Sequence, residues 1–173
     1  MTSVTQTSET ARRSDASFSK YMTFRLAAED YGIPILKVRE IIGVLPMTRV
    51  PNKVDALRGV INLRGRIIPV VDLRQKFGLA PCELRENAVI IVVQYNQAGM
   101  DLTVGLLVDE VLEVLKLEQS QVDLQPEYGS GEARARFVMG IGKLEQRMIF
   151  LVSLEDVLSR EEAASLAFKG DNQ

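Results

Sequence analysis

Three arginines interrupt a stretch of the chain that is otherwise apolar enough to be buried. They are Arg58, Arg64 and Arg66, in the run RGVINLRGRIIPVVDLRQKFG from Arg58 to Gly78. An arginine stem can lie on apolar atoms while its guanidinium stays in water, and the guanidinium can bind a carboxylate through two parallel hydrogen bonds. These residues therefore predict recognition of an acidic group at the edge of an apolar surface, with an ordinary exposed turn residue as the alternative for Arg64.

Side chains that commonly catalyse reactions or bind metals are scarce. The sequence has no histidine and a single cysteine, Cys82, which excludes histidine-based triads and cysteine–histidine zinc sites. The glycines that begin at Gly140, in GIGKLE, do not form a phosphate-binding loop, and the acidic pair Asp109-Glu110 suits a solvated strand end. We expect no catalytic residue, no metal and no cofactor, with an enzyme that uses lysine or carboxylate groups as the open alternative.

Length and composition are those of an ordinary soluble globular protein. The chain has 173 residues, of which 46% are hydrophobic and 25% charged, and its formal net charge is -2. It is long enough to bury a core as one domain or as two small subdomains. Because this charge provides no basic field that could hold a polyanion, we expect no nucleic acid partner.

Cysteine content and hydropathy predict a location in the cytoplasm. One thiol cannot form an internal disulfide, which suits a reducing compartment. No apolar run approaches the roughly 20 residues that a membrane span needs, and the first residues contain no secretion signal. We therefore expect no direct membrane insertion. The Ser- and Thr-rich residues 1–17 bury nothing and are expected to form a disordered tail.

Two blocks of sequence recur, in the same order, in the two halves of the chain. GVINLRGRIIPVVDLRQKF from Gly59 aligns with GIGKLEQRMIFLVSLEDVL from Gly140, and GIPILKVREIIGV from Gly32 aligns with GLLVDEVLEVLKL from Gly105. The repeats match at most apolar positions. One matching block could arise by chance between β-rich sequences, but two in the same order favour a structural duplication.

Most polar positions do not match between the repeats. The matching apolar positions are therefore the ones that the fold needs, and the polar positions found in one repeat alone are candidates for binding. The position of Arg64 in the first repeat is occupied by Glu145 in the second. Arg66 is the exception because it repeats as Arg147, so a structural ion pair at a strand end is the favoured interpretation there.

Short strands joined by tight turns are expected to position these side chains. Val60–Leu63 and Arg66–Val71 should pair as a hairpin around Arg64-Gly65, where glycine allows the positive φ of a tight turn. Pro69 cannot donate a ladder hydrogen bond, so its strand should be an edge strand or carry a bulge. Asp72 should cap a short helix, LRQKF.

The segment LKVREIIGVL, from Leu36, is ambiguous between helix and strand. Either conformation places Val38 and Ile41 on one face, with Arg39 and Glu40 nearer solvent. Between the repeated blocks, the polar, turn-rich residues 118–136 read as a long surface connection.

About five strands in each half, curled, would close into a small barrel and remove its own edges. We predict a mostly β protein of two five-stranded barrels, formed by internal duplication, with short helices and a C-terminal helix. The predicted limits are a single domain at 18–168, with subdomains at about 18–80 and 88–152 and the helix at 153–168. Two barrels packed side by side would leave a groove between them.

The same residues resemble a known family. NLRGRIIPVVDLRQKFG from Asn62, preceded by LRGVI, resembles the signature of the CheW family, the chemotaxis coupling proteins. The blocks YGIPILKVREIIGV, TRVPN, VGLLVDEVLEVL and GIGKLEQRMIFLVSLEDVL resemble the other blocks of that family in the same order, over roughly Ser19 to Leu166. The domain also ends the histidine kinase CheA and begins CheV-type proteins. Without a kinase or receiver region, this chain fits a free-standing coupling protein.

The resemblance implies two SH3-like barrels around a shared hydrophobic interface and no catalytic activity. It implies a scaffold that couples the cytoplasmic tip of chemoreceptors to the regulatory domain of CheA, recruited to membrane-associated arrays. The alternatives are a coupler for a non-flagellar pathway, controlling surface motility or second-messenger output, and a ligand-binding or enzymatic domain that uses the groove between the barrels.

Positions that match the family's two binding surfaces follow from the same resemblance. Residues implied to contact the receptor helix are Val38, Gly59, Gly105, Val111 and Val114. Residues implied to contact the kinase are Glu40, Ile41, Arg58, Arg64 and Gly65; Arg64 is open to either partner.

Overall fold

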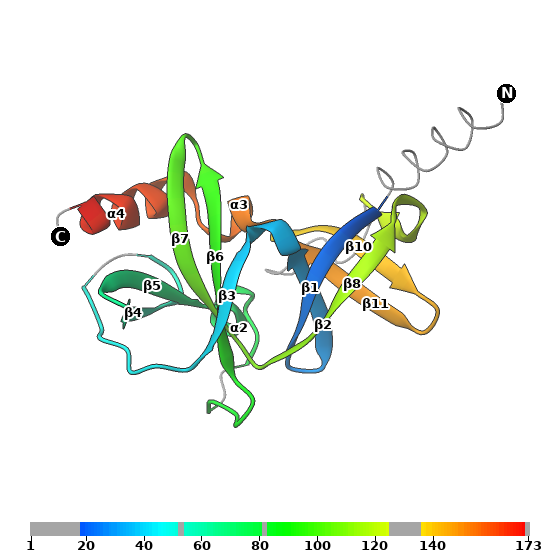
Figure 1. The fold of residues 1–173 in the computed structure, drawn as a ribbon, viewed down its shortest axis with the longest axis horizontal. Helices are drawn as coiled ribbons and strands as arrows, with labels where there is room; N and C mark the ends of the chain where they lie inside the picture. The colour runs from blue at the N-terminus through cyan, green and yellow to red at the C-terminus, as the bar shows by residue number, and fades with distance from the viewer. Residues whose placement is uncertain (1–17, 52–53, 81–82, 125–135, 172–173) are drawn as a thin grey trace, which may run out of the picture.

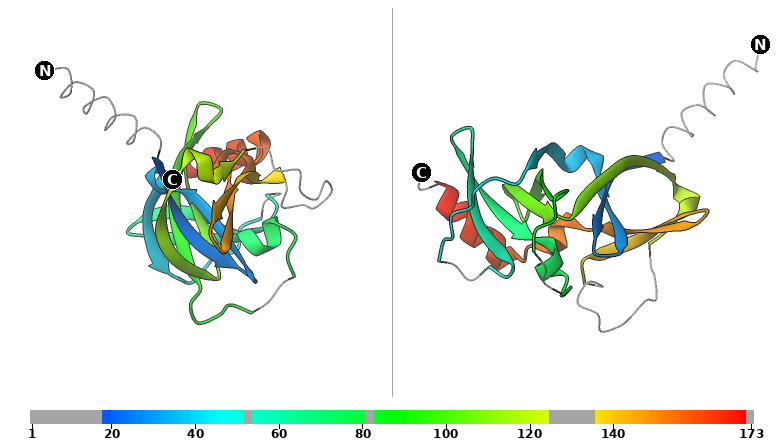
Figure 2. Two further views of the ribbon diagram at one scale, coloured as in Figure 1. Left: turned by 90° about the vertical axis from the view of Figure 1, so that its right-hand side faces the viewer. Right: turned by 90° about the horizontal axis from the view of Figure 1, so that it is seen from below.

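The computed structural model describes residues 18–51, 54–80, 83–124 and 136–171 of the chain. The predicted disordered tail, residues 1–17, and Cys82 lie outside the described residues. Two curled β-sheets lie side by side along the long axis of the molecule (Figure 1). Figure 2 shows the same arrangement from two further sides. We call the five-stranded sheet barrel 1 and the six-stranded sheet barrel 2, and the predicted mostly β fold class is confirmed.

Barrel 1 has the strand order β3-β6-β7-β5-β4. Its strands are β3 (Val38–Gly43), β4 (Leu57–Leu63), β5 (Arg66–Asp72), β6 (Val89–Gln97) and β7 (Met100–Val108).

Barrel 2 has the strand order β8-β1-β2-β11-β10-β9. Its strands are β1 (Phe18–Leu26), β2 (Glu29–Pro34), β8 (Glu110–Glu118), β9 (Val122–Asp123), β10 (Val138–Leu144) and β11 (Arg147–Val152).

The halves of the chain exchange strands between the barrels. Barrel 1 takes its strands from one continuous segment, 38–108, whereas barrel 2 combines β1 and β2 with the strands that follow residue 109. β3 pairs with β6, and β8 pairs with β1. The sheets therefore do not follow the predicted subdomains at about 18–80 and 88–152. The physical reason is that duplicated strands offer equivalent edges, so the third strand of each repeat can pair with the other repeat.

Matching ladders confirm the internal duplication. The hairpins β4–β5 and β10–β11 carry the same irregularity, a register shift between Leu57 and Gly59 in the first and between Val138 and Gly140 in the second. The second strand of each hairpin also joins its sheet by parallel pairing, β5 with β7 and β11 with β2.

The predicted hairpin around Arg64-Gly65 is present. Arg64 and Gly65 have φ of 52° and 85°, as the two-residue turn of a twisted hairpin requires. The prediction for Pro69 is wrong, because β5 lies between β4 and β7 and the register shift of its ladder lies elsewhere. Val60 of β4 lies opposite Pro69, but its N–H and its carbonyl oxygen both bond to the backbone of Thr48 on the other side of β4. The missing N–H of Pro69 therefore removes no hydrogen bond from the ladder between β4 and β5.

A short helix follows each hairpin. Asp72 caps α2 (Leu73–Lys76) by accepting hydrogen bonds from two backbone N–H groups, as predicted. The corresponding helix after β11 is α3 (Leu154–Val157), where Ser153 occupies the cap position without a side-chain bond.

The predicted helix at 153–168 is divided into α3 and α4 (Arg160–Asp171). Leu158 between them is extended and fully buried. Ser159 then begins α4 through reciprocal bonds: its N–H donates to the Glu162 carboxylate at 3.0 Å, and its hydroxyl accepts from the Glu162 N–H at 3.0 Å. The sequence SREE at 159–162 is the capping-box signal for this second start.

Part of the predicted surface connection at 118–136 belongs to barrel 2. The 3-10 turn η2 (Gln119–Gln121) leads into β9, which pairs with β10 and adds the sixth strand. The other 3-10 turn, η1 (Ile35–Lys37), joins β2 to β3 where the chain passes between the barrels.

The largest hydrophobic core lies between the barrels, as the resemblance implied. Barrel 2 contributes Phe24 and Tyr31, barrel 1 contributes Val93 and Leu106, and α2 is followed by Phe77. The ring of Tyr31 lies 5.9 Å from that of Phe24 and 5.4 Å from that of Phe77. Each barrel also encloses a smaller core of its own. No helix within the described residues is long and apolar enough to cross a bilayer.

Candidate functional site

The shared core reaches the surface along two edge strands, β3 of barrel 1 and β8 of barrel 2. Two valines, Val38 and Val111, are half-buried and pack on this core. Ile41 and Val114 continue the same faces outward and are 40% and 47% exposed. We call these four residues, Val38, Ile41, Val111 and Val114, the core rim.

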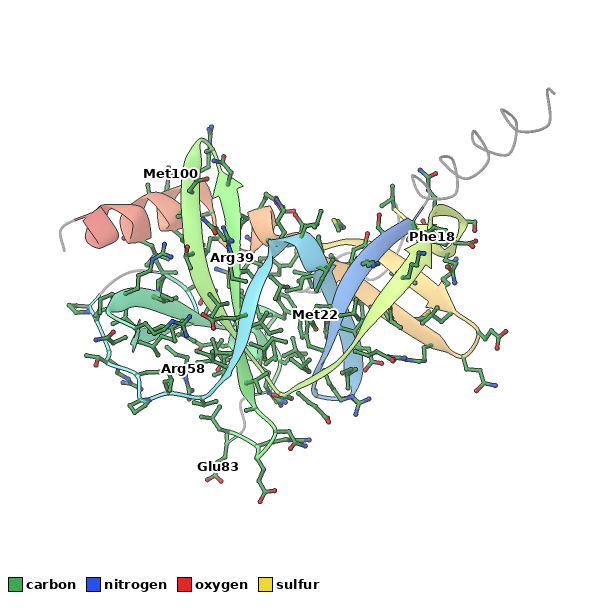
Figure 3. The ribbon with its side chains drawn as sticks, in the orientation of Figure 1. Phe18, Met22, Arg39, Arg58, Glu83 and Met100 are labelled. Carbon is green, nitrogen blue, oxygen red and sulfur yellow. The ribbon has the colours of Figure 1, made fainter. Side chains whose placement is uncertain are left out.

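Strand register establishes that the rim residues point toward the shared core. Residues directly opposite one another on antiparallel strands project from the same face of a sheet. All four partners of the rim residues belong to the shared core. The pairs are Val38 with Val93, Ile41 with Ile91, Val111 with Phe24, and Val114 with Met22. Figure 3 shows Met22 between β3 and β1. The prediction that Val38 and Ile41 share a face is confirmed.

The two glycines of the predicted receptor surface are buried and serve the fold. A Cβ on Gly59, where φ is +150°, would lie 2.5 Å from the carbonyl oxygen of Thr48. Its repeat, Gly140, has the same contact with the carbonyl oxygen of Asp123, at 2.8 Å. Because both copies are held in the same way, this glycine is a requirement of the hairpin.

Gly105 has the same kind of internal explanation. It faces Val70 in the parallel ladder of barrel 1, and a Cβ there would lie 2.7 Å from the side chain of Ile90. Its repeat, Gly32, lies in the parallel ladder of barrel 2, where a Cβ would lie 3.3 Å from Ile149. Of the five residues predicted for the receptor, the structure brings the three valines to the core rim and places both glycines inside.

Three of the residues predicted for the kinase meet at one end of barrel 1. Arg64 is 70% exposed and forms an ion pair with Glu40, beside the turn glycine Gly65. They line an open hollow of about 750 Å³ that also contains Arg39, Arg66, Gln94 and Thr103, over a floor of Leu63, Ile68 and Val92. We call this group of residues the arginine mouth.

The other two predicted kinase residues lie elsewhere. Ile41 belongs to the core rim. Neighbouring strand residues point to opposite faces, so Glu40, which lies opposite Val92, points to the interior of barrel 1. Arg58 sits near the base of the hairpin, 3.7 Å from the carboxylate of Asp72. Figure 3 shows Arg58 and Arg39 at different heights of barrel 1.

Arg58 lines a second hollow, of about 570 Å³. Its other lining residues are mainly apolar. Most come from the segment after β3 and the start of β4, one from α2 and one from the segment before β6; they are Val44, Leu45, Met47, Arg49, Val50, Leu57, Gln75 and Leu84.

Sequence reasoning missed Arg39 and Thr103 as parts of the arginine mouth, and it assigned Arg66 a structural ion pair. Arg39 donates a hydrogen bond to Gln94, and Arg66 donates one to the Thr103 hydroxyl at 3.1 Å. The alignment of the two repeats could have indicated Arg39 as a candidate binding residue, because it aligns with the uncharged Leu112.

Among the residues that the structure describes, the ion pair predicted for Arg66 and Arg147 is present at Arg147 and absent at Arg66. Arg147 lies 3.0 Å from the carboxylate of Asp30 and 2.8 Å from that of Glu113. Hydrogen bonds to Glu113 and then Asp30 raise the pKa of Arg147. Arg66 has a threonine, Thr103, as its neighbour at the position equivalent to Asp30.

A buried ion pair joins barrel 1 to the C-terminal helix. The ammonium of Lys76, whose side chain is 5% exposed, lies 3.1 Å from both carboxylate oxygens of Glu162. Burial would raise the pKa of Glu162, but hydrogen bonds from the N–H of Ser159, from Lys76 and from the N–H of Asp55 more than offset it and lower that pKa. The pair therefore links α2 to the first turn of α4 and is a structural contact.

The described residues contain no group of three or more cysteine or acidic side chains placed to hold a metal ion. What they do present is a partly exposed apolar rim on the shared core and a separate, positively charged hollow on barrel 1. Two such surfaces suit binding of two different protein partners.

Comparison with known proteins places these features in a family context. The model of the CheW-like domain family matches residues 20–162 of the chain. The chemotaxis protein CheW of Klebsiella aerogenes is 42% identical over 145 residues, which cover 84% of each chain. The chemotaxis protein CheW of Bacillus subtilis is 32% identical, over 84% of this chain and 90% of its own.

The fold is also similar to a solved structure. The crystal structure of the scaffolding protein TtCheW from Thermoanaerobacter tengcongensis superposes with a TM-score of 0.70 at 33% sequence identity. The match covers 80% of this chain and 91% of that protein.

Proposed function

This chain belongs to the CheW family, and from that premise we propose that it is a non-catalytic adaptor that couples chemoreceptors to the histidine kinase CheA. The observation that carries the proposal is the presence of two distinct surfaces of different chemistry, the core rim and the arginine mouth. An adaptor needs to hold two partners at once, and separate surfaces permit this. Recruitment from the cytoplasm to a membrane-associated receptor array would follow from the receptor contact.

We assign the receptor to the core rim. An amphipathic helix binds where a concave apolar surface accepts side chains spaced by three or four residues. Val38 and Val111 would form the buried side of such a contact, and Ile41 and Val114 its exposed side. Ile41 joins this surface because of its position on β3. Gly59 and Gly105 would act indirectly, by keeping the neighbouring strands close.

We assign the kinase regulatory domain to barrel 1, with Glu40, Arg64 and Gly65 as its main contacts. Charged residues around a small apolar floor set register and partner choice more than raw affinity. Arg58, at the base of the same hairpin, would be a peripheral contact. Each contact can be weak on its own, because an array links many copies and raises the effective concentration of every partner.

The same two surfaces would serve a flagellar or a non-flagellar array, since the partners decide the output. A ligand-binding or enzymatic use of the groove between the barrels is the alternative from another class. Saturable binding of a small molecule, or turnover, by the purified protein would favour that alternative.

Binding measurements with two fragments test the proposal directly. Val114→Asp places a charge on the core rim and should weaken binding of a receptor-tip fragment about tenfold or more, because a carboxylate must be desolvated there. Arg64→Glu should weaken binding of the CheA regulatory domain by a similar factor. Titration calorimetry with each fragment gives both affinities.

Met148→Asp is the matched control, since Met148 is 51% exposed on β11, outside both surfaces. It should leave both affinities unchanged. Circular dichroism verifies that all three variants are folded. Wild-type protein that binds neither fragment would refute the adaptor proposal, and a Met148→Asp effect equal to that of Val114→Asp would refute the assignment of the core rim.

A further inference from the structure

The duplication allows the two barrels to be compared position by position, and it reveals a missing acidic group in barrel 1. In barrel 2, Arg147 binds two carboxylates, those of Asp30 and Glu113. Asp30 comes from β2 and Glu113 from the bulged part of β8. This arginine therefore has a complete set of counter-charges from its own chain.

The equivalent arginine of barrel 1 has lost both counter-charges. Arg66 aligns with Arg147, and the position of Asp30 is occupied by Thr103, which offers Arg66 a neutral hydroxyl at 3.1 Å. The position of Glu113 is occupied by Glu40, but Glu40 pairs with Arg64. Within the described part of the chain, no carboxylate lies within 4.0 Å of the Arg66 guanidinium.

A second cation adds to the excess positive charge of this site. Arg39 is exposed on β3 and donates to the neutral amide of Gln94. The arginine mouth thus gathers three guanidinium groups, those of Arg39, Arg64 and Arg66, around one carboxylate, that of Glu40. The equivalent end of barrel 2 has a leucine, Leu112, in place of Arg39.

The shape of the mouth fits a side chain that has both an acidic head and an aliphatic stem. The hollow of about 750 Å³ has a floor of Leu63, Ile68 and Val92, while the arginines stand at its border. An arginine binds a carboxylate through paired hydrogen bonds of fixed geometry, and this binding is strongest where apolar groups exclude water.

We propose that the arginine mouth receives an Asp or Glu side chain of the kinase regulatory domain, which occupies beside Arg66 the place that Asp30 occupies beside Arg147. This inference rests on the proposed function and names the chemistry of its kinase contact. It also assigns roles to Arg39, Arg66 and Thr103. Thr103 matters because it leaves the acidic position vacant for a partner.

Supplying the missing acid from within the chain tests the proposal. Thr103→Asp restores the arrangement of barrel 2, so its carboxylate should pair with Arg66 and exclude the carboxylate of the partner. We expect the affinity for the CheA regulatory domain to fall about tenfold. Thr103→Asn, which has nearly the same shape without the charge, should stay within about twofold of wild type. Thermal unfolding of both variants verifies their folds.

The salt dependence of binding gives an independent measurement that does not require Thr103→Asp to fold. Arg66→Gln should weaken the complex and make its affinity less dependent on salt, because an ion pair between the partners has been removed. Lys143→Gln, at an exposed site in barrel 2, is the control and should keep the wild-type salt dependence.

The outcomes separate this inference from the proposed function. If wild type binds the kinase domain but Thr103→Asp and Arg66→Gln bind equally well, the inference is wrong and the adaptor role stands. Equal weakening by Thr103→Asp and Thr103→Asn also overturns it, because the lost hydroxyl would then explain the effect. If wild type does not bind the kinase domain, the proposed function fails and this inference fails with it.

Discussion

At the scale of single residues, Lys76 shows how one carboxylate makes a buried charge tolerable. Its ammonium is almost inaccessible to water, and Glu162 is the group that compensates it, at 3.1 Å. Glu162 also accepts hydrogen bonds from the backbone N–H groups of Asp55 and Ser159. One side chain therefore ties together α2, the segment before β4 and the start of α4. Removing its charge would leave the ammonium of Lys76 without compensation.

The stability of the protein should consequently depend on the ionisation of Glu162. Its pKa in the folded state is lowered, so the ionised carboxylate stabilises the fold above the ordinary carboxyl pKa, and this contribution is lost as the pH falls through the folded-state value. Glu162→Gln should lower the free energy of unfolding at neutral pH by about 1–3 kcal/mol and flatten its decline in acid.

Urea unfolding of wild type and variant between neutral and acidic pH measures this difference. Glu161→Gln, an exposed neighbour on α4, is the control and should follow the wild-type curve. Curves for wild type and Glu162→Gln that run parallel down to the acid limit would show that Glu162 does not contribute in this way.

Residue-scale features of the candidate sites were predicted only in part. The exposed position of Arg64 and the cap formed by Asp72 follow from local turn and helix chemistry, and both are confirmed. Ile41 and Glu40 lie on opposite faces, as neighbouring strand residues do, but the conformation of LKVREIIGVL as a bulged strand could not be predicted. The bulge between Val38 and Glu40 lets Val38 and Ile41 share a face, and it is a property of the pairing between β3 and β6.

At the scale of elements, the β4–β5 hairpin is fixed by the close approach of a neighbouring segment. Thr48 makes two backbone hydrogen bonds with Val60, at 2.8 and 2.9 Å. This brings the carbonyl oxygen of Thr48 against Gly59, where a side chain would collide with it. The hairpin that presents Arg64 therefore depends on a buried glycine.

Gly59→Ala should destabilise the protein by about 2–4 kcal/mol, since the new methyl group meets a backbone atom and the residue keeps a positive φ. Gly43→Ala is the matched control in the same barrel, because a Cβ there meets nothing within 4 Å. It should be neutral or stabilise by up to about 1 kcal/mol. Denaturant midpoints of the two variants decide the question, and equal midpoints would contradict the account of Gly59.

Elements with strong local signals were predictable, and elements that depend on distant pairing were not. Two-residue turn chemistry is sufficient to predict the hairpin around Gly65, because its register is set locally. The interior position of β5 requires knowledge that β7 pairs with it in parallel, which no local pattern around Pro69 reveals. The division of the C-terminal helix has a local signal, the capping box of Ser159 and Glu162.

At the scale of the whole molecule, exchange of strands connects the two barrels into one body. The chain passes from β7 of barrel 1 to β8 of barrel 2 at Asp109. The Asp109 carboxylate accepts from the Arg74 guanidinium at 2.5 Å and from the N–H of Ala27 at 2.8 Å, and the Asp109 N–H donates to the carbonyl oxygen of Arg25. This crossing is therefore held by α2, which follows β5 of barrel 1, and by the β1–β2 hairpin of barrel 2.

The duplication predicted two barrels from sequence, but it could not assign strands to them. Equivalent strands such as β3 and β8 carry equivalent patterns, so both the exchanged and the unexchanged pairings satisfy the sequence. Which candidate residues lie together could be determined only from the strand pairing. The pairing of β3 with β6 places Ile41 in the core rim, and the hollow of the arginine mouth is lined by Arg66 and Thr103 as well.

We propose that separate surfaces of this one molecule hold a receptor helix and a kinase domain together. The most direct test is sedimentation velocity of the protein with a receptor-tip fragment and the CheA regulatory domain, alone and combined. We predict a ternary complex, from which Val114→Asp releases only the receptor fragment and Arg64→Glu releases only the kinase domain. Competition between the two partners for wild-type protein, or loss of both from either variant, would contradict the claim.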